Sequence, residues 1–297
     1  MLVTMKELLE DAYQGGYAVC AANVWYDAST MAALDAAEEM DSPLILNYNY
    51  NPNVYRWMDY AKLWASKTRV PVAINHDHGA TYEEAMNCIH AGFTSVMADR
   101  SSLPFEENIA QVAEIVKVAH ACGVTVEGEL GHVGSARTDD NNNQALYTDP
   151  DQAAEYVERT GVDCLAVAIG TAHGQYNKGI TPKIDFERLA AIEEKVHIPL
   201  VLHGGSGSGD ENLAKAAKTA ICKINIFTDN HEASKQAIAK AWEEKPGIFL
   251  PFLDDIGYFA FKKSLKYYLE LFGSAGKAQN YRELSPLEHD VPRRVLL

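Results

Sequence analysis

The chain has 297 residues and a formal net charge of −15 at pH 7, with 47% hydrophobic and 23% charged residues. This is the composition of an ordinary globular protein, so long disordered tracts are not expected. Nucleic-acid and anionic-membrane surfaces need clustered Lys and Arg, and the acidic excess argues against both as partners. Length alone fits either one barrel or two smaller domains.

Signals for export and for disulfide bonding are missing from the sequence. Residues 1–10 carry acidic side chains and no apolar signal-peptide core, and no segment approaches the roughly 20 apolar residues of a membrane span. The five cysteines form no CxxC pair and mostly lie in apolar runs, which favours free, buried thiols. We therefore expect a cytoplasmic protein.

Short runs rich in β-branched residues alternate with amphipathic segments, the pattern of repeated βα units. Strands are predicted near residues 17–23, 43–47, 70–75, 95–98, 124–129, 163–169, 199–202 and 221–226. Helices are predicted between them over residues 29–40, 81–91, 105–122, 149–160, 185–195 and 210–220. Several of these helices open with the Ser, Thr or Asp of an N-cap. Eight units in about 230 residues fit a closed (β/α)8 TIM barrel better than an open doubly wound sheet.

Two segments exceed what a barrel needs. Residues 132–148 form a polar loop after the fifth predicted strand, long enough to be a mobile cover for an active site. From about residue 232 onward, helical segments over 233–242 and 260–272 are expected to pack on the barrel or on a second subunit. The prediction is one TIM-barrel domain over residues 1–297 with extra C-terminal helices.

Polar side chains suited to chemistry stand at the ends of most predicted strands. Along the chain they are His76, Asp77, His78, Asp99, Glu127, Glu129, His173, His203 and Asn225. Catalytic groups in a barrel come from the carboxyl ends of different strands, so these side chains should converge. Imidazoles from His78, His173 and His203 would suit Zn²⁺ and leave a fourth position open to polarise a substrate carbonyl.

The sequence His76-Asp77-His78 sets a geometric condition for this site. Neighbours in an ideal strand face opposite sides, so His76 and His78 would share one side and Asp77 would face the other. For Asp77 and His78 both to reach the site, the third strand must end or bend here. A lone histidine is more often a hydrogen-bonded or surface group than a ligand, and this interpretation is kept for His76 and His132.

A glycine-rich turn, Gly204-Gly205-Ser206-Gly207, directly follows the seventh predicted strand. Barrels commonly build a phosphate site there from backbone N–H groups. The turn alone is a weak signal, but it comes directly after His203, and Thr228 lies one strand away. The sequence therefore predicts a phosphate site at this turn.

At these residues the sequence resembles the class II fructose-bisphosphate and tagatose-bisphosphate aldolase family over nearly the whole chain. The matching motifs cover residues 70–79, 95–99, 103–108, 129–131, 170–174, 202–207, 223–225 and 272–277. The resemblance implies a lyase of carbohydrate metabolism with a catalytic Zn²⁺ on His78, His173 and His203. It implies that Asp77 exchanges a proton with the hydroxyl at the scissile bond and that Asn225 holds the enediolate.

The resemblance also implies how a substrate and further ions are held. It places Gly174, Gly204, Ser206 and Thr228 around the phosphate of a dihydroxyacetone-phosphate-like half. Asp99 and Glu129 match carboxylates that hold a second metal, divalent or monovalent, or that buttress His78. A homodimer or homotetramer is implied as well.

The chain departs from the family pattern in its loops. Family members carry a glutamate after the fifth strand that shuttles the enediolate proton, whereas residues 134–140 read GSARTDD. Asp139 or Asp140 must substitute for this glutamate, or the transfer of the enediolate proton differs.

Phe227 stands where fructose-specific members place Asp and tagatose-type members a small residue, and its ring cannot accept a hydrogen bond from a sugar hydroxyl. Residues 250–258 lack the Asp-Pro-Arg pattern that reaches a neighbouring subunit's second phosphate, and residues 47–51 replace a Ser-containing turn.

We therefore interpret the chain as an aldolase of altered specificity. Its substrate would be a phosphorylated ketose with one phosphate or a different aldehyde half, yielding dihydroxyacetone phosphate, or a similar keto half, and an aldehyde. Standard ketose-bisphosphate cleavage is an alternative, with Lys262, Lys263 or Arg282 replacing the missing Arg. A non-catalytic metal-binding homologue and a zinc hydrolase are the remaining alternatives, and the intact Asp77, Asn225 and three histidines weigh against the first of these two.

Overall fold

The computed structural model describes residues 1–134, 136, 146–174, 176 and 181–284, and only the backbone at Asn280 and at residues 282–284. In these residues eight parallel strands form a closed barrel in the order β1-β2-β3-β4-β5-β6-β7-β8. The strands are β1 (Val19–Asn23), β2 (Leu44–Asn49), β3 (Val72–Gly79), β4 (Ser95–Ala98), β5 (Thr125–Leu130), β6 (Cys164–Val167), β7 (Leu200–Leu202) and β8 (Ile221–Ile226). The predicted (β/α)8 barrel is confirmed.

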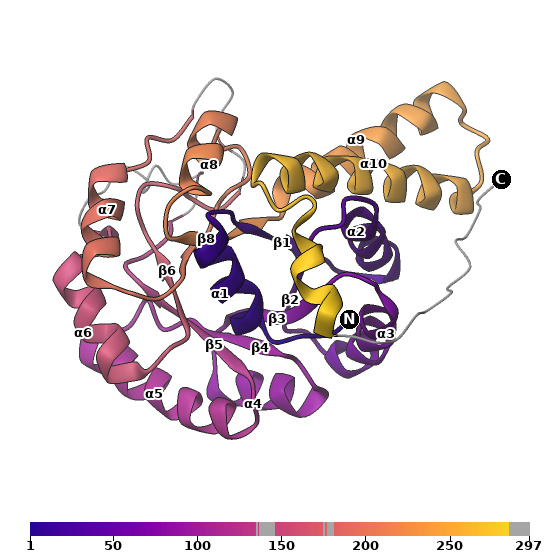
Figure 1. Ribbon diagram of the computed structural model, residues 1–297. Coiled ribbons are helices and arrows are strands. Elements are labelled where there is room, and N and C mark those ends of the chain that lie inside the picture. The colour runs from indigo at the N-terminus through magenta and orange to yellow at the C-terminus, as the bar shows by residue number, and fades with distance from the viewer. Residues whose placement is uncertain (135, 137–145, 175, 177–180, 285–297) are drawn as a thin grey trace.

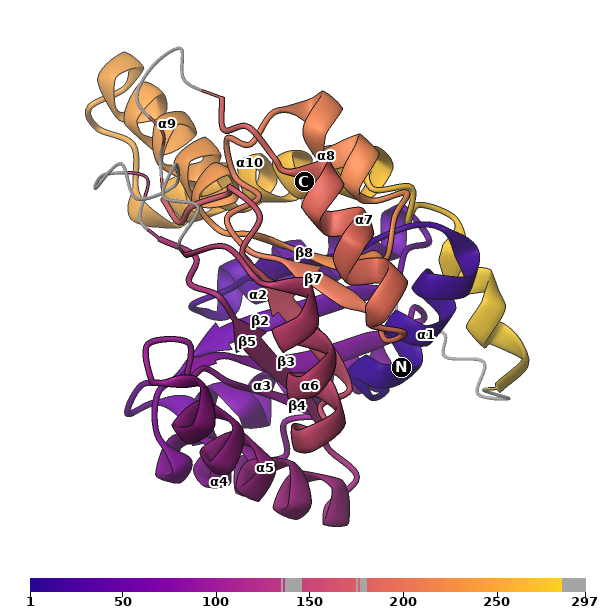
Figure 2. The same cartoon turned by 90° about the vertical axis from the view of Figure 1, so that its left-hand side faces the viewer.

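Helices form a ring around the barrel (Figure 1), and a view turned by 90° shows them stacked along its sides (Figure 2). They are α2 (Asp27–Glu39), α3 (Val54–Lys67), α4 (Tyr82–Ala91), α5 (Phe105–Ala121), α6 (Pro150–Thr160), α7 (Phe186–Lys195) and α8 (Asp210–Ala216). A further helix, α1 (Met5–Gly15), precedes the first strand and lies across one end of the barrel (Figure 1). Within the described residues, no helix combines the length and apolar character that crossing a membrane requires.

Two helices, α1 and α3, were not among those predicted from the sequence. The start of α1 carries a capping box, in which Glu7 N–H donates to the Thr4 side chain and the Glu7 carboxylate accepts from Thr4 N–H. The Thr4 and Glu7 spacing is a sequence signal that could have located this helix. By contrast, β4 and β8 have the predicted bounds, and the other strand ends differ from prediction by a few residues.

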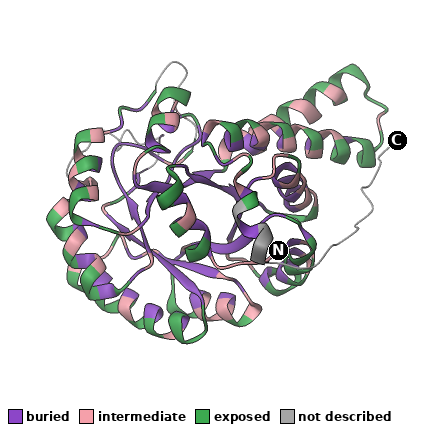
Figure 3. Cartoon of the chain, in the orientation of Figure 1, coloured by how far each residue is buried: buried purple, intermediate pink, exposed green. Residues whose placement is uncertain are grey.

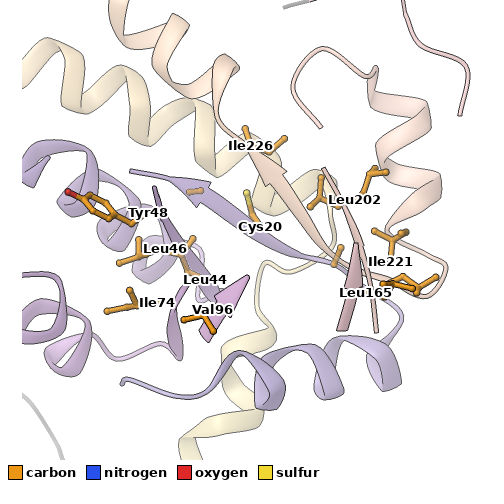
Figure 4. Close-up of a cluster of buried hydrophobic side chains, with 14 of the residues drawn as sticks. Cys20, Leu44, Leu46, Tyr48, Ile74, Val96, Leu165, Leu202, Ile221 and Ile226 are labelled. Carbon is orange, nitrogen blue, oxygen red and sulfur yellow. The ribbon is translucent and has the colours of Figure 1, made fainter. Parts of the chain in front are cut away.

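The two faces of each strand bury different kinds of side chain. Outward-facing residues such as Leu44, Leu46, Ile74 and Val96 pack against the surrounding helices (Figure 4). The opposite faces fill the barrel, and at one end they form an apolar cluster with Met5, Leu8 and Leu9 of α1. Colouring by burial shows the strands enclosed and the outer helix faces exposed (Figure 3).

Further along the strands, the barrel interior becomes polar. Asn47, Asn75 and Ser95 are fully buried and joined by hydrogen bonds, from Asn75 Nδ2 to Asn47 Oδ1 at 2.9 Å and from Ser95 Oγ to Asn75 Oδ1 at 2.7 Å. Glu127 and Lys223 lie in this interior as well. The polar interior leads to the carboxyl ends of the strands, where the candidate site lies.

The extra C-terminal helices expected from the sequence are α9 (Thr228–Glu244) and α10 (Leu250–Leu271), followed by a 3₁₀ helix (Lys277–Leu284). Helices α9 and α10 pack on each other, and α10 also packs on α2. The pair projects beyond the helix ring (Figure 1). Helix α9 begins directly after β8, earlier than the predicted residue 233, so its first turn adjoins the strand ends.

Candidate active site

An irregularity at the end of β3 brings both Asp77 and His78 to the site. The pairing of β3 with β4 shifts between His76 and Gly79, and His78 adopts φ 51°, in the left-handed region. Few non-glycine residues adopt this conformation, and it turns His78 away from the side it would share with His76. His76 remains fully buried against the rings of Tyr50 and Phe93. The bend that the sequence requires is therefore present.

Three imidazoles meet at the carboxyl end of the barrel. The ring centroids of His78 lie 4.9 Å from His173 and 4.7 Å from His203, and those of His173 and His203 are 5.7 Å apart. One ring nitrogen from each histidine lies within 4.8 Å of the others. The rings come from β3, from the segment after β6 and from the residue that follows β7.

Each of these histidines is held by a second contact. His203 Nε2 lies 2.8 Å from Glu127 Oε1, and His78 Nδ1 lies 2.8 Å from Asp99 Oδ2. The backbone of His173 is paired with the segment after β5, where His173 N donates to the Gly134 carbonyl at 2.8 Å. Ring partners such as Glu127 and Asp99 orient imidazoles that bind metals.

Two unpaired polar atoms, His203 Nδ1 and Glu129 Oε2, lie near each other beside the rings. Among the described residues, buried atoms without a hydrogen-bond partner include His203 Nδ1, Glu129 Oε2 and Asn225 Oδ1. Glu129 Oε2 lies 3.7 Å from His203 Nδ1 and 4.0 Å from His78 Nδ1. Buried polar atoms are normally paired, so atoms without partners call for a ligand. Imidazole nitrogens with a nearby carboxylate fit Zn²⁺, and His78, Asp99 and Glu129 form a second group within 4.8 Å.

Burial and nearby carboxylates together set the charges of the candidate ligands. It lowers the pKa of His173 to about 4 and that of His203 well below its ordinary value, so both rings are neutral at pH 7, as metal ligands must be. Burial also lowers the pKa of His78, but Asp77 and Asp99 outweigh it and raise this pKa to about 10. Burial, with the nearby charge of Asp99, raises the pKa of Glu129 to about 8.

The Asp77 carboxylate lies beside His78 and is held by two amides. Its Oδ2 accepts from Asn23 Nδ2 at 2.6 Å, and its Oδ1 accepts from Asn225 Nδ2 at 3.2 Å. Burial alone would raise the pKa of Asp77, but the nearby His78 and Lys223 lower it below its ordinary value. The carboxylate is therefore ionised, fixed in place and able to accept a proton.

The glycine-rich turn follows β7 in the chain and contacts the start of α9. Gly204 has φ 65°, and a side chain there would approach the Ala172 carbonyl oxygen to 2.5 Å, so only glycine fits. Ser206 Oγ accepts from Asp229 N at 3.3 Å, which joins the turn to the first turn of the helix that Thr228 opens. Helix N-termini and exposed glycine N–H groups are suited to binding phosphate. Gly174, with φ 96°, lies two residues after Ala172.

The structure thus groups His78 with His173 and His203 and with Asp99 and Glu129. It also joins Asp77 to Asn225 and Ser206 to the start of α9, and it adds further residues. Asn23, which contacts Asp77, was not singled out, although it is a polar residue ending the first strand. Glu127 was noted at a strand end without a role, and Lys223 was noted only as part of a motif. Asp139 and Asp140, the candidates for the loop acid, lie outside the described residues, as does most of the loop expected to cover the site.

Known proteins resemble this chain along nearly its whole length. The family model described as fructose-bisphosphate aldolase class-II matches residues 3–277. A protein named fructose-bisphosphate aldolase from Geobacillus stearothermophilus is 40% identical over 287 residues, covering 93% of this chain and 99% of that protein. A probable fructose-bisphosphate aldolase of Bacillus subtilis is 42% identical over 257 residues, covering 84% and 90%. The crystal structure of the YdjI aldolase from Escherichia coli K12 superposes with a TM-score of 0.83 at 38% identity, covering 94% of this chain and 100% of that one.

Proposed function

Since the chain belongs to the class II fructose-bisphosphate aldolase family, we propose that it is a zinc-dependent aldolase of non-standard specificity. It would cleave or form a carbon–carbon bond in a phosphorylated ketose, giving dihydroxyacetone phosphate, or a similar keto half, and an aldehyde. The observation that carries the proposal is the meeting of His78, His173 and His203 beside the buried carboxylate of Asp77.

The three histidines would hold the catalytic Zn²⁺. Bound there, the cation supplies Lewis-acid stabilisation of negative charge on a substrate oxygen. In cleavage, Asp77 takes the proton from the hydroxyl at the scissile bond, and the carbon left by the broken bond takes up a proton, for which Asp139 or Asp140 is the candidate donor. In condensation both proton transfers run in reverse. Asn23 and Asn225 keep the carboxylate oriented through the two hydrogen bonds that it accepts.

The phosphate of the keto half would bind at the glycine-rich turn. Backbone N–H groups at Gly174, Gly204 and the first turn of α9, with the hydroxyls of Ser206 and Thr228, offer donors there. Asn225 extends from β8 between this turn and Asp77, so its amide is suited to holding the oxygens of the reacting keto half.

Asp99 and Glu129 have two proposed roles. The 2.8 Å contact of Asp99 with His78 supports a buttressing role that orients the ring. The grouping of both carboxylates with His78 supports a second cation, divalent or monovalent.

The far end of the site supports a substrate with a single phosphate. Phe227, 46% exposed, follows β8, and its ring lies 4.7 Å from the ring of His231. Burial lowers the pKa of His231, so its ring adds no positive charge there at pH 7. Trp25 is exposed after β1, and the segments 24–30 and 227–234 contain no Lys or Arg. A second phosphate would lack a cation from these segments, whereas an uncharged aldehyde half would contact aromatic surface.

Standard ketose-bisphosphate cleavage needs a Lys or Arg side chain from another segment to bind the second phosphate. Lys262 Nζ is bound to Glu39 at 2.8 Å on the side of α10 that faces α2, which weighs against its use for a second phosphate. Lys263 is exposed, and the side chain of Arg282 lies outside the described residues.

We further propose that the enzyme acts in the cytoplasm as a homodimer or homotetramer.

A panel of ketose 1-phosphates and ketose bisphosphates, assayed for release of dihydroxyacetone phosphate with and without chelator, tests the function. We expect faster cleavage of a ketose 1-phosphate, loss of activity with chelator and recovery with Zn²⁺. A preference for fructose or tagatose bisphosphate would establish the standard activity instead. Ester or amide hydrolysis without triose phosphate release would establish a hydrolase.

A further inference from the structure

A fully buried pair of charged side chains lies behind the three imidazoles. Lys223 on β8 and Glu127 on β5 are both 0% exposed. Lys223 Nζ donates to Glu127 Oε2 at 2.6 Å, and Glu127 Oε1 lies 2.8 Å from His203 Nε2. The three side chains thus form a continuous line through the barrel interior from Lys223 to His203.

Fold stability alone does not account for this pair. Removing two charges from water is costly, and a well-packed apolar pair of similar volume is often equally stable or more so. Lys223 also does not serve as a nucleophile, because its ammonium group is bound to Glu127 and has no exposed surface. The contact of Glu127 with His203 is therefore the remaining role for the pair.

The pair determines which nitrogen of His203 carries the proton. Glu127 Oε2 already accepts from Lys223 Nζ, and a carboxylate oxygen accepts hydrogen bonds, so Nε2 of His203 is the donor to Oε1. Nδ1 is then left with a free lone pair, and this is the atom that has no hydrogen-bond partner and lies 3.7 Å from Glu129 Oε2. Lys223 donates to the other carboxylate oxygen and holds Glu127 in place.

We propose that Glu127 and Lys223 are positioning residues that fix the tautomer and orientation of His203, so that Nδ1 rather than Nε2 faces the metal. This inference rests on the zinc site of the proposed function. It concerns a contact behind the ligands and gives neither residue a contact with substrate.

Glu127→Gln separates tautomer control from packing. Lys223 is a donor only, so the single amide oxygen of Gln must face it, and the amide NH₂ must face His203. Nε2 then has to accept, the proton moves to Nδ1, and the metal-binding lone pair is lost. We expect the Zn²⁺ dissociation constant to rise by about 10- to 100-fold, the usual effect of removing such a partner.

The double variant Glu127→Gln/Lys223→Met should bind Zn²⁺ more tightly than Glu127→Gln alone. Met leaves the amide free to turn its oxygen toward Nε2–H, which restores the proton to Nε2. A purely structural role predicts the opposite, since the double variant loses more native contacts. Glu127→Asp provides a variant that keeps the charge pair and the fold while shortening the reach to His203, and it should also bind Zn²⁺ more weakly.

The measurements use the full chain after metal removal. Zn²⁺ affinity is obtained by competition with a chromophoric chelator, and the Co²⁺ absorption spectrum reports the ligand geometry. Ile45→Ala, a truncation of a buried side chain in the apolar part of the barrel, is the control and should lower the melting temperature without changing Zn²⁺ affinity.

The outcomes distinguish the two proposals. Absence of Zn²⁺ binding by the wild-type chain would refute the metal site itself. Wild-type binding with unchanged affinity in Glu127→Gln and Glu127→Asp, or a double variant weaker than Glu127→Gln, would overturn the positioning role. Trapping of substrate on Lys223 by borohydride would overturn it as well.

Discussion

The Asp77 carboxylate is held between two amide side chains, which orient it and leave proton exchange to the carboxylate itself. We expect Asp77→Asn to lower kcat by about 10²- to 10⁴-fold, the usual contribution of a general acid or base. The substitution preserves size, so Zn²⁺ affinity should stay within a few-fold of wild type.

The matched control is Asp163→Asn. Asp163 bonds to Lys6 and His120 near α1, away from the imidazoles, and its substitution should leave kcat unchanged. Full activity of Asp77→Asn in the aldolase assay would remove Asp77 from the mechanism.

Glu129 should make the metal-free protein less stable as the pH rises. Its ordinary pKa is 4.5, and burial raises the value in the folded chain to about 8. Between these values the folded chain binds more protons than the unfolded chain, so the free energy of unfolding falls with increasing pH. A Gln side chain cannot ionise, so the Glu129→Gln variant should lack this decrease in the free energy of unfolding, which is on the order of a few kcal/mol. The free energy of unfolding is measured with urea for the wild type and for Glu129→Gln from pH 5 to 8. The same pH dependence in both proteins would contradict this expectation.

At the scale of elements, the end of β3 depends on close packing around Gly79. A side chain there would approach the Met97 carbonyl oxygen to 2.5 Å and His76 Cε1 to 2.6 Å. Arg100 fixes the same corner, since its Nη1 donates to the Gly79 carbonyl at 2.6 Å and to the Asp99 carbonyl at 2.7 Å. The corner therefore cannot relax without displacing His78.

We expect Gly79→Ala to lower the free energy of unfolding by roughly 1–3 kcal/mol, as overpacking does, and to weaken Zn²⁺ binding. Gly247→Ala is the control, because no atom lies within 4 Å of the added carbon. Thermal unfolding and chelator competition measure both effects. Equal behaviour of the two variants would show that the corner tolerates a side chain.

The start of α9 connects the phosphate turn to the C-terminal helices. The Asp229 carboxylate accepts from Gly207 N at 3.0 Å and from the hydroxyl of Tyr268 on α10. The turn therefore depends on α10 for its position. This connection explains why helices added after the barrel belong to the architecture of the site.

For the whole molecule, the projecting α9 and α10 pair carries large apolar side chains on its surface. Trp242, Phe249 and Phe252 are 55%, 72% and 57% exposed. Exposed apolar patches of this kind mark interaction sites, which supports the proposed homo-oligomer. We expect light scattering to give the mass of a dimer or tetramer.

Phe249→Glu combined with Phe252→Glu should reduce this mass while leaving the circular dichroism spectrum unchanged. Lys240→Glu, an exposed substitution on α9, should leave the mass as it is. A monomeric wild-type chain at micromolar concentration would refute the oligomer.

The sequence alone determined the barrel and most of the candidate site. Parallel strands buried on both faces appear as short continuous apolar runs, and their alternation with amphipathic helices admits few folds. Because the carboxyl ends of all barrel strands share one rim, the strand pattern predicted that His78, His173 and His203 lie near one another, and the family resemblance separated them from His76.

Only the tertiary structure decided how these side chains are oriented. The left-handed backbone at His78 belongs to the irregular pairing of β3 with β4. The amide of Asn23 on Asp77 and the line from Lys223 through Glu127 to His203 depend on partners 54 to 96 positions apart in the chain. Local patterns report which face of an element is buried. They carry no information on which distant polar groups meet inside a closed barrel, because barrel closure and side-chain packing determine those contacts.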